Sequence, residues 1–543
     1  MQIDSVCIVG GGSSGWMTAA ALSKLCPHLQ IALVESPNIK TVGVGESTLG
    51  HFNKFLRLLG LKDEDWMPAC NATYKNSIRF TNFKTKDSGS FEYPFQRGFD
   101  YTGKGDGLQL DAWMEIKAID PSFDIPFAEF YATSNTLLAK YNKQTKNSDD
   151  KLRLFSHDTD TAYHLDAELF GQYLRDTIAL PNGVIHIVED VVGEIRDDTF
   201  GAKDRTYVPA IFTDKGTSIE ADLFIDCTGF KSRLLGNIAG SQLIPFKNLA
   251  NDSAWAARIP YGPDKESEME NVTDCTAIEN GWVWNIPLWN RIGTGYVYSS
   301  RFIDSEGAKE QFLNHLAQKY GADRIEGVQP FQINIKHGRR RRAWVSNIVG
   351  IGLSYGFVEP LESTGLLTTH ENIIRLSEVL NRRKGWVTRS EIETYNYAAE
   401  REVCGFADFV AMHYAYSMRD DTAYWKWCTE INEYDMDMID CIVRDNRVHA
   451  TIADSFATGT NLPDLGGVNY ILGGLDVKAT TLPEVSRMKR HGTYMTDEYY
   501  YEIRDNFMKE YNQVVEYVKG LPSNYQYLLE NIYGGVDKYV ESI

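Results

Sequence analysis

The sequence predicts an α/β fold in which a Rossmann-like body with mixed sheets is followed by a mostly helical cap. A short apolar strand near the N-terminus leads through a glycine-rich turn into a helix. Later apolar strands also end at glycines, and helical periodicity dominates from about Glu371 onward. We therefore expect a body over residues 1–370, with inserted segments at about 75–180, and a cap over residues 371–543.

The composition is that of an ordinary folded protein. Of the 543 residues, 43% are apolar and 24% are charged. The 55 basic and 74 acidic side chains give a formal charge of −19, which would repel a phosphate backbone or an anionic membrane face. No apolar run approaches the roughly 18 residues that a transmembrane helix needs. We expect neither nucleic acid nor a membrane as a partner.

Cysteine and histidine usage gives no sign of a metal centre. The eight cysteines are scattered without the close pairs of a zinc site, and the eleven histidines form no His-Glu-x-x-His block. The first residues also lack the charged and then apolar order of a secretory leader. We expect free thiols, no bound metal and a cytoplasmic location.

The first motif is a strand, a glycine turn and a helix. Val6–Val9 is apolar, Gly10–Gly15 reads Gly-Gly-Gly-Ser-Ser-Gly, and Trp16–Leu22 is rich in alanine and leucine. In such a unit the second glycine, here Gly12, lets the backbone approach a pyrophosphate, and the helix N-terminus presents free N–H groups to it. This predicts a dinucleotide site with contacts from Gly10, Gly12, Ser13, Ser14 and Gly15.

An acidic residue follows this turn at the distance typical of dinucleotide sites. The apolar strand Ile31–Val34 ends at Glu35, which can accept hydrogen bonds from ribose hydroxyls. This pattern alone is compatible with NAD or FAD. Only one such unit occurs, and three further apolar segments reach glycines: 43–48, 222–229 and 348–353. That spread suits a long cofactor held extended across one fold, which favours FAD.

A Trp-x-Trp-x-Ile-Pro motif spans Trp282–Pro287. By composition alone it indicates a strand hairpin with alternating aromatic residues. In a chain with an N-terminal FAD fingerprint, the motif resembles the signature of the flavin-dependent halogenases, typified by the tryptophan halogenases. The resemblance keeps the family's order over roughly residues 3–475. The other matching segments are Gly43–Thr48, Ala72–Lys75, Ile78–Phe80, Asp252–Ala256, Glu359–Gly365 and His413–Trp425.

The resemblance implies an enzyme that uses reduced FAD, oxygen and a halide, chloride or bromide, to form hypohalous acid, which then halogenates an electron-rich arene. Because only one dinucleotide fingerprint is present, we expect reduced FAD to come from a separate flavin reductase. The sequence is also compatible with a homo-oligomer. Beyond the glycine turn, the expected FAD contacts are Glu35, Gly45, Glu46, Ser47, Val191, Leu353 and Leu366.

The resemblance also assigns two expected catalytic residues. Lys75 falls at the family's active-site lysine, and its ammonium could hydrogen-bond hypohalous acid or could itself be halogenated on nitrogen. The sequence leaves both courses open. Glu362 could orient the electrophile or accept the proton that the arene releases, although an acidic residue there also suits a helix N-terminus.

Two further pairs of residues take their expected roles from the same resemblance. Thr364 and Gly365 fall where the family holds the halide with backbone N–H groups, and glycine lets an anion approach closely. Trp282 and Trp284 carry no acid–base chemistry. We expect them to form a wall that keeps the arene away from the flavin, which favours halogenation over hydroxylation.

The chain departs from the tryptophan-specific members in two places. Tyr93 precedes Pro94-Phe95, where many tryptophan halogenases have histidine, and we expect Tyr93 and Phe95 to contact the substrate. The segment before Asn469 reads Leu-Pro-Asp-Leu-Gly-Gly-Val over 462–468, in place of an aromatic block that holds free tryptophan. We therefore expect an indole or phenol type of substrate other than free tryptophan.

Two other functions compete with this interpretation. An FAD-dependent aromatic monooxygenase would use the same fold, but the Gly-Asp-Ala turn usual after its late strand is replaced here by Gly352-Leu353-Ser354. A non-catalytic flavin-binding sensor is disfavoured by Lys75 together with the tryptophan pair. The basic run Arg339–Arg342 is expected to be a solvated or paired edge.

Overall fold

The computed structural model describes residues 1–39, 43–103, 109–146, 151–197, 207–431, 465–477 and 496–534. Contacts between residues divide the chain into two compact units. Unit 1 contains 1–72, 164–246 and 335–404, and unit 2 contains 73–163, 247–334 and 405–543. These interleaved bounds differ from the consecutive ranges 1–370 and 371–543. The division of labour between a flavin-binding body and a substrate cap stays a prediction, because contacts alone do not say which ligand each unit binds.

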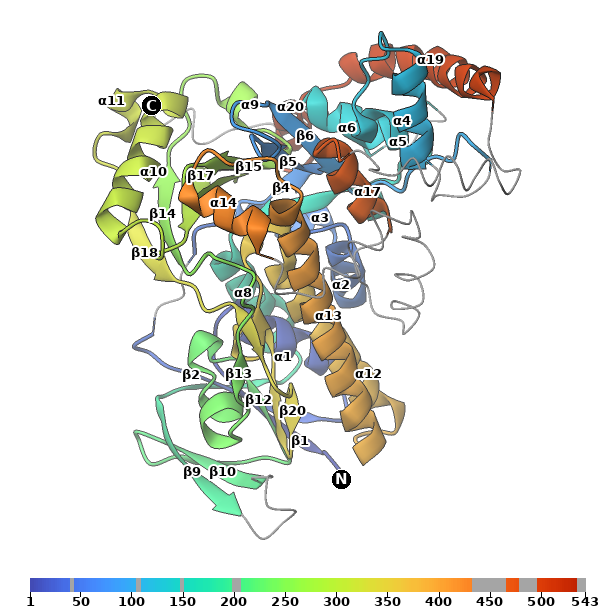
Figure 1. Cartoon of the computed structure of the whole chain (residues 1–543). Helices are drawn as coiled ribbons and strands as arrows, with labels where there is room; N and C mark the ends of the chain where they lie inside the picture. The colour runs from blue at the N-terminus through green and yellow to red at the C-terminus, as the bar shows by residue number, and fades with distance from the viewer. Residues whose placement is uncertain are drawn as a thin grey trace. The chain divides into compact units, whose positions relative to one another are not determined.

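The centre of unit 1 is a six-stranded sheet in the order β20-β21-β12-β1-β2-β8 (Figure 1). Its strands are β1 Ser5–Val9, β2 Gln30–Glu35, β8 Ile185–Val188, β12 Leu223–Asp226, β20 Trp344–Val345 and β21 Ile348–Gly350. All neighbours pair in parallel except β20 and β21, which are antiparallel. β1 and β12 are almost completely buried, as expected for apolar parallel strands covered on both faces. The structure confirms the predicted α/β fold.

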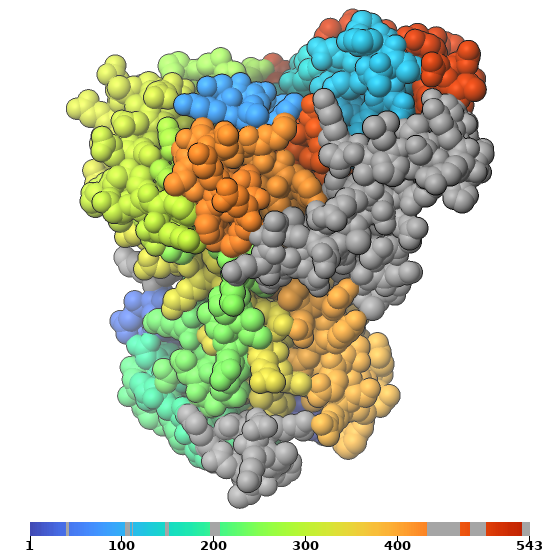
Figure 2. Space-filling model, in the orientation of Figure 1, coloured from blue at the N-terminus to red at the C-terminus, as the bar shows by residue number. Residues whose placement is uncertain are grey.

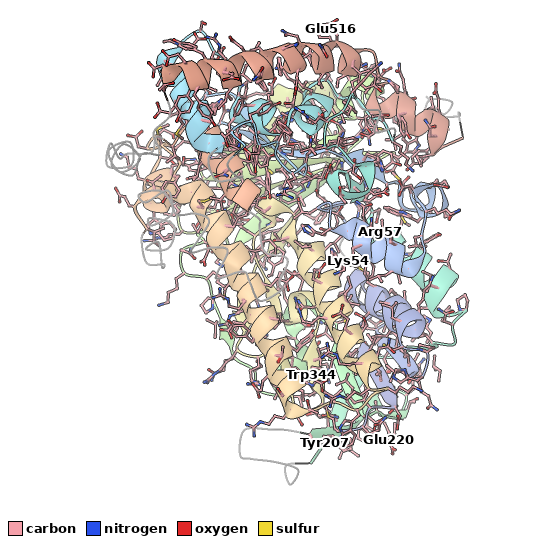
Figure 3. All side chains as sticks on the ribbon, turned by 90° about the vertical axis from the view of Figure 1, so that its right-hand side faces the viewer. Lys54, Arg57, Tyr207, Glu220, Trp344 and Glu516 are labelled. Atoms are coloured by element: carbon pink, nitrogen blue, oxygen red, sulfur yellow. The ribbon has the colours of Figure 1, made fainter. Side chains whose placement is uncertain are left out.

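Helix α1 (Ser13–Leu25) follows β1 directly and contacts α8 (Ala167–Leu174) and α12 (Thr364–Arg382). Its Ala19–Ala21 run has no exposed surface, because small side chains let the neighbouring helices approach closely. Helix α2 (Phe52–Leu59) also contacts α12 and carries Lys54 and Arg57, both labelled in Figure 3.

Unit 1 also contains smaller antiparallel sheets. One consists of β9 Val191–Asp197, β10 Tyr207–Thr213 and β11 Ser218–Glu220, and another of β13 Leu243–Ile244, β19 Gly338–Arg340 and β22 Gly356–Phe357. The basic run begins in β19, and both expected alternatives occur in it. Arg339 binds Glu400 and Arg342 lies 2.9 Å from Glu393, whereas Arg341 is exposed to solvent.

Unit 2 is built on a seven-stranded mixed sheet in the order β18-β14-β17-β16-β15-β5-β6. Its strands are β5 Ser77–Thr81, β6 Ser90–Pro94, β14 Ser253–Ile259, β15 Val272–Ile278, β16 Gly281–Pro287, β17 Ile292–Tyr298 and β18 Phe331–Asn334. The predicted aromatic hairpin is the antiparallel pair β16 and β17. Helix α10 (Ser305–Tyr320) buries Phe312 and Leu316 in a hydrophobic cluster with residues of β14, β16 and β17. Figure 2 shows the yellow-green part of the chain, to which α10 belongs, at the surface.

Within the described residues, every regular element after residue 364 is a helix, which confirms the predicted helical periodicity. These helices are α12, α13 Arg389–Ala415, α14 Ala423–Glu430, α17 Leu465–Gly474, α19 Asp497–Lys519 and α20 Asn524–Asn531. None of the described helices combines the length and the apolar character needed to cross a membrane. The seven cysteines in the described ranges are free thiols.

Candidate active site

The glycine turn of unit 1 is shaped by close backbone contacts at two of its glycines. Gly10 has φ +116°, and a Cβ on it would lie 2.3 Å from the carbonyl oxygen of Cys227. A Cβ on Gly15 would lie 1.9 Å from the carbonyl oxygen of Gly10. At Gly12, by contrast, an added Cβ would meet nothing within 4 Å. The turn therefore leaves open space at the N-terminus of α1, which fits the approach of a pyrophosphate.

Glu35 ends β2 beside this turn. A Cβ on Gly11 would lie 1.6 Å from Oε2 of Glu35, so the carboxylate and the turn are in close contact. Oε1 lies 2.7 Å from Nε2 of His186, and the side chain remains partly exposed. The backbone N–H of Glu189 donates to the carbonyl of Glu35, which brings the start of β9 at Val191 to the same edge of the sheet. This edge fits a ribose and its attached base.

The loops after β12 and β21 reach the same side of unit 1. Asp226 is fully buried and accepts hydrogen bonds from the backbone N–H groups of Thr228, Leu234 and Leu235 at 2.8–3.0 Å. These bonds fix the turn after β12. Gly352 has φ +67°, and a Cβ on it would lie 3.1 Å from Cβ of Ser14. The turn that carries the half-exposed Leu353 therefore lies against the N-terminus of α1.

A third pair of segments meets at the start of α12. Strand β3 (Glu46–Ser47) pairs with residues 164–165 of β7 (Ala162–Leu165), and the Ser363 hydroxyl donates to the Ser47 hydroxyl at 3.1 Å. Ser363 has φ 56° and precedes the buried Thr364. A Cβ on Gly365 would contact only Cε2 of Phe357, at 3.9 Å. The first turn of α12 thus leaves space beside a glycine backbone, which fits a small anion.

Three of the residues predicted from the sequence, Glu46, Glu362 and Leu366, belong to these segments. Glu46 keeps contact with solvent, yet the surrounding protein and the Asp166 carboxylate raise its pKa to about 7. Glu362 is buried in the short helix η7 (Pro360–Glu362), and Leu366 is buried in the first turn of α12. Gly45, with φ +125°, precedes Glu46.

Lys75 lies in unit 2, at the end of the short strand β4 (Thr73–Lys75), and has no exposed surface. Its Nζ lies 5.0 Å from the centroid of the Phe95 ring, a distance at which an ammonium is attracted to the face of the ring. The rings of Tyr93 and Phe95 are 6.4 Å apart. The structure therefore brings together the lysine and the two residues expected to contact the substrate.

A buried polar framework holds this aromatic pair. Asn135 accepts the backbone N–H of Phe95 at 2.9 Å through its Oδ1, and its own N–H donates to Oε1 of Gln96 at 2.9 Å. The Tyr470 hydroxyl donates to the carbonyl of Gln96 at 3.0 Å. No sequence pattern indicates Asn135 or Gln96 as supporting residues, because an isolated buried asparagine or glutamine belongs to no motif.

Tyr93 also approaches helix α17. Its ring lies 5.5 Å from that of Tyr470 and 6.0 Å from that of Phe409. A Cβ on Gly467 would lie 2.9 Å from the Tyr93 hydroxyl oxygen. The sequence predicts that the segment before Asn469 lacks the aromatic clamp for free tryptophan. Residues 461–464 of that segment lie outside the described ranges, so the absence of the clamp stays a prediction.

Trp282 and Trp284 are buried on β16, with ring centroids 6.2 Å apart. The ring of Trp284 lies against Gly295 of the neighbouring strand β17, where an added Cβ would lie 2.2 Å from Cη2. The expected nucleotide and halide contacts and Glu362 are thus grouped in unit 1. Lys75, Tyr93, Phe95 and the tryptophan pair are grouped in unit 2.

Comparison with known proteins decides the family. The model of the tryptophan halogenase family matches residues 5–462. The chain belongs to the tryptophan halogenase family. The family predicted from the sequence motifs is therefore confirmed, and the protein is an FADH2-dependent halogenase of aromatic substrates.

Curated relatives of this halogenase include two enzymes named for tryptophan. It is 35% identical over 440 residues to the tryptophan 6-halogenase SttH of Streptomyces toxytricini, an alignment that covers 78% of this chain and 80% of SttH. It is 32% identical over 439 residues to the tryptophan 7-halogenase RebH of Lentzea aerocolonigenes, covering 78% of each chain.

Solved structures with the same fold cover almost all of this halogenase. The apo structure of VirX1 is 50% identical, with a TM-score of 0.87, and the match covers 98% of this chain and 100% of VirX1. BrvH, a flavin-dependent halogenase from Brevundimonas sp. BAL3, is 30% identical with a TM-score of 0.81, covering 97% of this chain and 99% of BrvH.

Proposed function

We propose that this halogenase acts on an electron-rich indole or phenol type of small molecule other than free tryptophan. The observation that carries the proposal is the buried Lys75 ammonium over the ring of Phe95, with Tyr93 beside it. Aromatic side chains with one buried donor suit a flat apolar ring. Gly467, close to the Tyr93 hydroxyl, leaves no room for a further large side chain that could hold an amino-acid tail.

When bound, reduced FAD from a separate flavin reductase would activate oxygen, which is the oxidant that converts chloride or bromide to hypohalous acid. We propose that the glycine turn, Glu35, Val191 and Leu353 hold the nucleotide. The Glu46–Ser47 strand and Leu366 complete that site. The backbone N–H groups of Thr364 and Gly365 would hold the halide, because the open space beside Gly365 admits an anion.

Lys75 would act on the hypohalous acid. Its ammonium can donate a hydrogen bond to the oxygen, which polarises the oxygen–halogen bond so that the halogen is transferred to a ring carbon. The leaving hydroxide then takes a proton from this ammonium and departs as water. Halogenation of the amine followed by transfer is the alternative course. Glu362 is proposed as the acceptor of the proton that the ring carbon loses. The buried tryptophan pair would keep the arene away from the flavin and so suppress hydroxylation.

The proposal is tested by product mass. The purified protein is supplied with chemically reduced FAD, oxygen and bromide, together with indole, phenol, substituted forms of both, and tryptophan. The expected product replaces one hydrogen by bromine and shows the bromine isotope doublet. A product that gains only oxygen would favour the monooxygenase, and the absence of any product with normal flavin binding would favour the sensor.

A further inference from the structure

We propose that the C-terminal helix α20 is a positioning element for Lys75. The inference rests on the proposed function, in which the Lys75 ammonium acts on hypohalous acid. Helix α20 lies outside residues 5–462, which match the family model, and Tyr527 is far from Lys75 in the sequence. Two separate sets of contacts within unit 2 join this helix to the residues on either side of the lysine.

The first set of contacts passes through Tyr74. Side chains alternate along a strand, so Tyr74 points away from the face that carries Lys75. It is fully buried, and its ring lies 6.1 Å from the ring of Tyr527 on α20. The rings of His157 and Tyr163 lie at 4.9 and 5.8 Å, and Nζ of Lys146 lies 6.0 Å from the centroid of the Tyr74 ring. Tyr527 therefore forms one wall of the pocket that anchors the Lys75 strand.

The second set of contacts passes through Asn76. Its side-chain amide donates to Oε1 of Gln144 at 2.7 Å, and its backbone N–H donates to the carbonyl of Asn271 at 2.7 Å. Residues 142–144 are in turn bonded to the start of α20. The N–H of Asn524 donates to the carbonyl of Asn142 at 2.9 Å, and the N–H of Gln144 donates to the carbonyl of Pro522 at 3.2 Å.

Helix α20 is itself firmly held. Ser523 and Gln526 form a capping box, and the Ser523 hydroxyl donates to Glu266 at 2.7 Å. Beyond the helix, Tyr533 stacks on Trp289 with centroids 3.8 Å apart. Trp289 closely follows Pro287, whose carbonyl accepts the Thr73 hydroxyl at 2.6 Å. The Lys75 strand, the end of β16 and α20 therefore form one connected framework.

The position of the Lys75 ammonium therefore depends on how firmly the strand that carries it is held. Lys75 has a long flexible side chain, and a small displacement of its backbone would move the ammonium by an amount that matters for transfer of the halogen. Removal of the Tyr527 ring should loosen the strand on the face opposite Lys75 while leaving the residues of unit 1 unchanged. Hypohalous acid would still form, but less of it would reach the arene.

The test compares Tyr527→Ala with Tyr527→Phe and with the control Tyr501→Ala, a partly exposed tyrosine on α19. We expect Tyr527→Ala to lower halogenated product per oxygen consumed by roughly tenfold, with oxygen consumption unchanged. Amide hydrogen exchange of the peptide covering 72–77 in the flavin-free protein should become roughly tenfold faster. Tyr527→Phe keeps the ring and should behave like the wild type on both readouts, as should Tyr501→Ala.

Lys75→Ala is measured in parallel. One outcome is that Lys75→Ala loses its halogenated product while Tyr527→Ala keeps the wild-type ratio of product to oxygen consumed, or the wild-type hydrogen exchange at 72–77. In that case the positioning role is wrong and the proposed function stands. If Tyr501→Ala loses as much halogenated product per oxygen consumed as Tyr527→Ala, the effect is a general one of the C-terminal helices and the inference is overturned. If Lys75→Ala keeps its product, the proposed role of the lysine fails, and the inference fails with it.

Discussion

The hydroxyl of Ser363 donates to the hydroxyl of Ser47 at 3.1 Å, although 316 positions separate the two residues in the sequence. Both are buried in unit 1. The bond joins the strand Glu46–Ser47 to the residue before Thr364 and Gly365. Two segments that separately resemble family motifs are therefore one local structure.

Gly365→Ala should weaken halide binding without harming the fold. The added Cβ would contact only Phe357, at 3.9 Å, and alanine favours a helix, so the melting temperature should stay the same or rise slightly. The methyl group would occupy the proposed anion space, and we expect the KM for bromide to rise about tenfold or more, as for the loss of a hydrogen bond to a charged group. Gly520→Ala, at the end of α19, is the control. An unchanged KM for bromide would place the halide elsewhere.

Gly12→Ala should weaken FAD binding without lowering the stability of the fold. A Cβ at Gly12 meets nothing within 4 Å, whereas a Cβ on Gly15 would lie 1.9 Å from the Gly10 carbonyl. Gly12→Ala should therefore melt like the wild type without FAD but bind FAD about tenfold more weakly in a fluorescence titration. Gly15→Ala should lower the melting temperature or fail to fold. Wild-type FAD affinity in Gly12→Ala would show that the pyrophosphate does not approach this glycine.

Lys75→Ala should lose halogenation but not the formation of hypohalous acid, because the lysine acts after the halide has been oxidised. We expect product to fall about 100-fold or more. A chemical trap for hypohalous acid should still report its release. Lys75→Met, which retains side-chain volume in this buried position, should show the same loss, whereas the exposed Lys509→Ala should not. Retention of most product in both Lys75 variants would contradict the assignment.

Simple indoles and phenols should react at least as well as tryptophan. A site that recognises the charged ends of an amino acid rejects analogues without them, whereas a mainly apolar site discriminates weakly. Competition between indole and tryptophan in one reaction gives the ratio of their kcat/KM values. A large preference for tryptophan with a single regioisomer would show that residues 461–468 do hold an amino-acid tail.

The contribution of Glu402 to the stability of this halogenase should fall as the pH rises from about 4.5 to about 7. Glu402 is fully buried, and burial with the nearby Glu371 carboxylate raises its pKa to about 7, although Arg375 at 3.1 Å opposes the shift. Between these pH values the Glu402 carboxyl of the folded protein keeps a proton that the unfolded chain has already lost. The stabilisation from this proton is complete below the pKa of the unfolded chain, and it is lost as the pH rises through the pKa of the folded protein. Glu402→Gln should remove this downward contribution from the plot of melting temperature against pH, and a plot with the wild-type slope would contradict the shift.

Much of the fold and part of the site could be predicted because their signals are local. The strand, turn and helix from Ser5 to Leu25, the acidic end of β2 and the aromatic hairpin of β16 and β17 each depend on residues close in sequence. Periodicity and glycine spacing report such elements directly. The two interleaved units could not be found this way, because no composition change or linker marks the points where the chain passes from one unit to the other.

The residues that support Lys75 and Phe95 were missed for a related reason. Asn135, Gln96 and Tyr527 act through contacts between distant segments, and each is an ordinary residue in its own segment. A buried amide is satisfied by whatever backbone group the fold brings to it, so its partner cannot be read from spacing. Only the structure connects them with the lysine.

The contact between Trp284 and Gly295 limits how the wall of β16 can be redesigned. Because any side chain at 295 would enter the Trp284 ring, a single substitution at 295 is incompatible with the ring in its present place. A smaller residue at 284 would instead leave a void above the glycine. A Cβ at 295 would also lie 2.8 Å from the carbonyl oxygen of Trp255, a clash that no change at 284 relieves. A mutant library intended to alter this wall should therefore keep Gly295 and vary position 284.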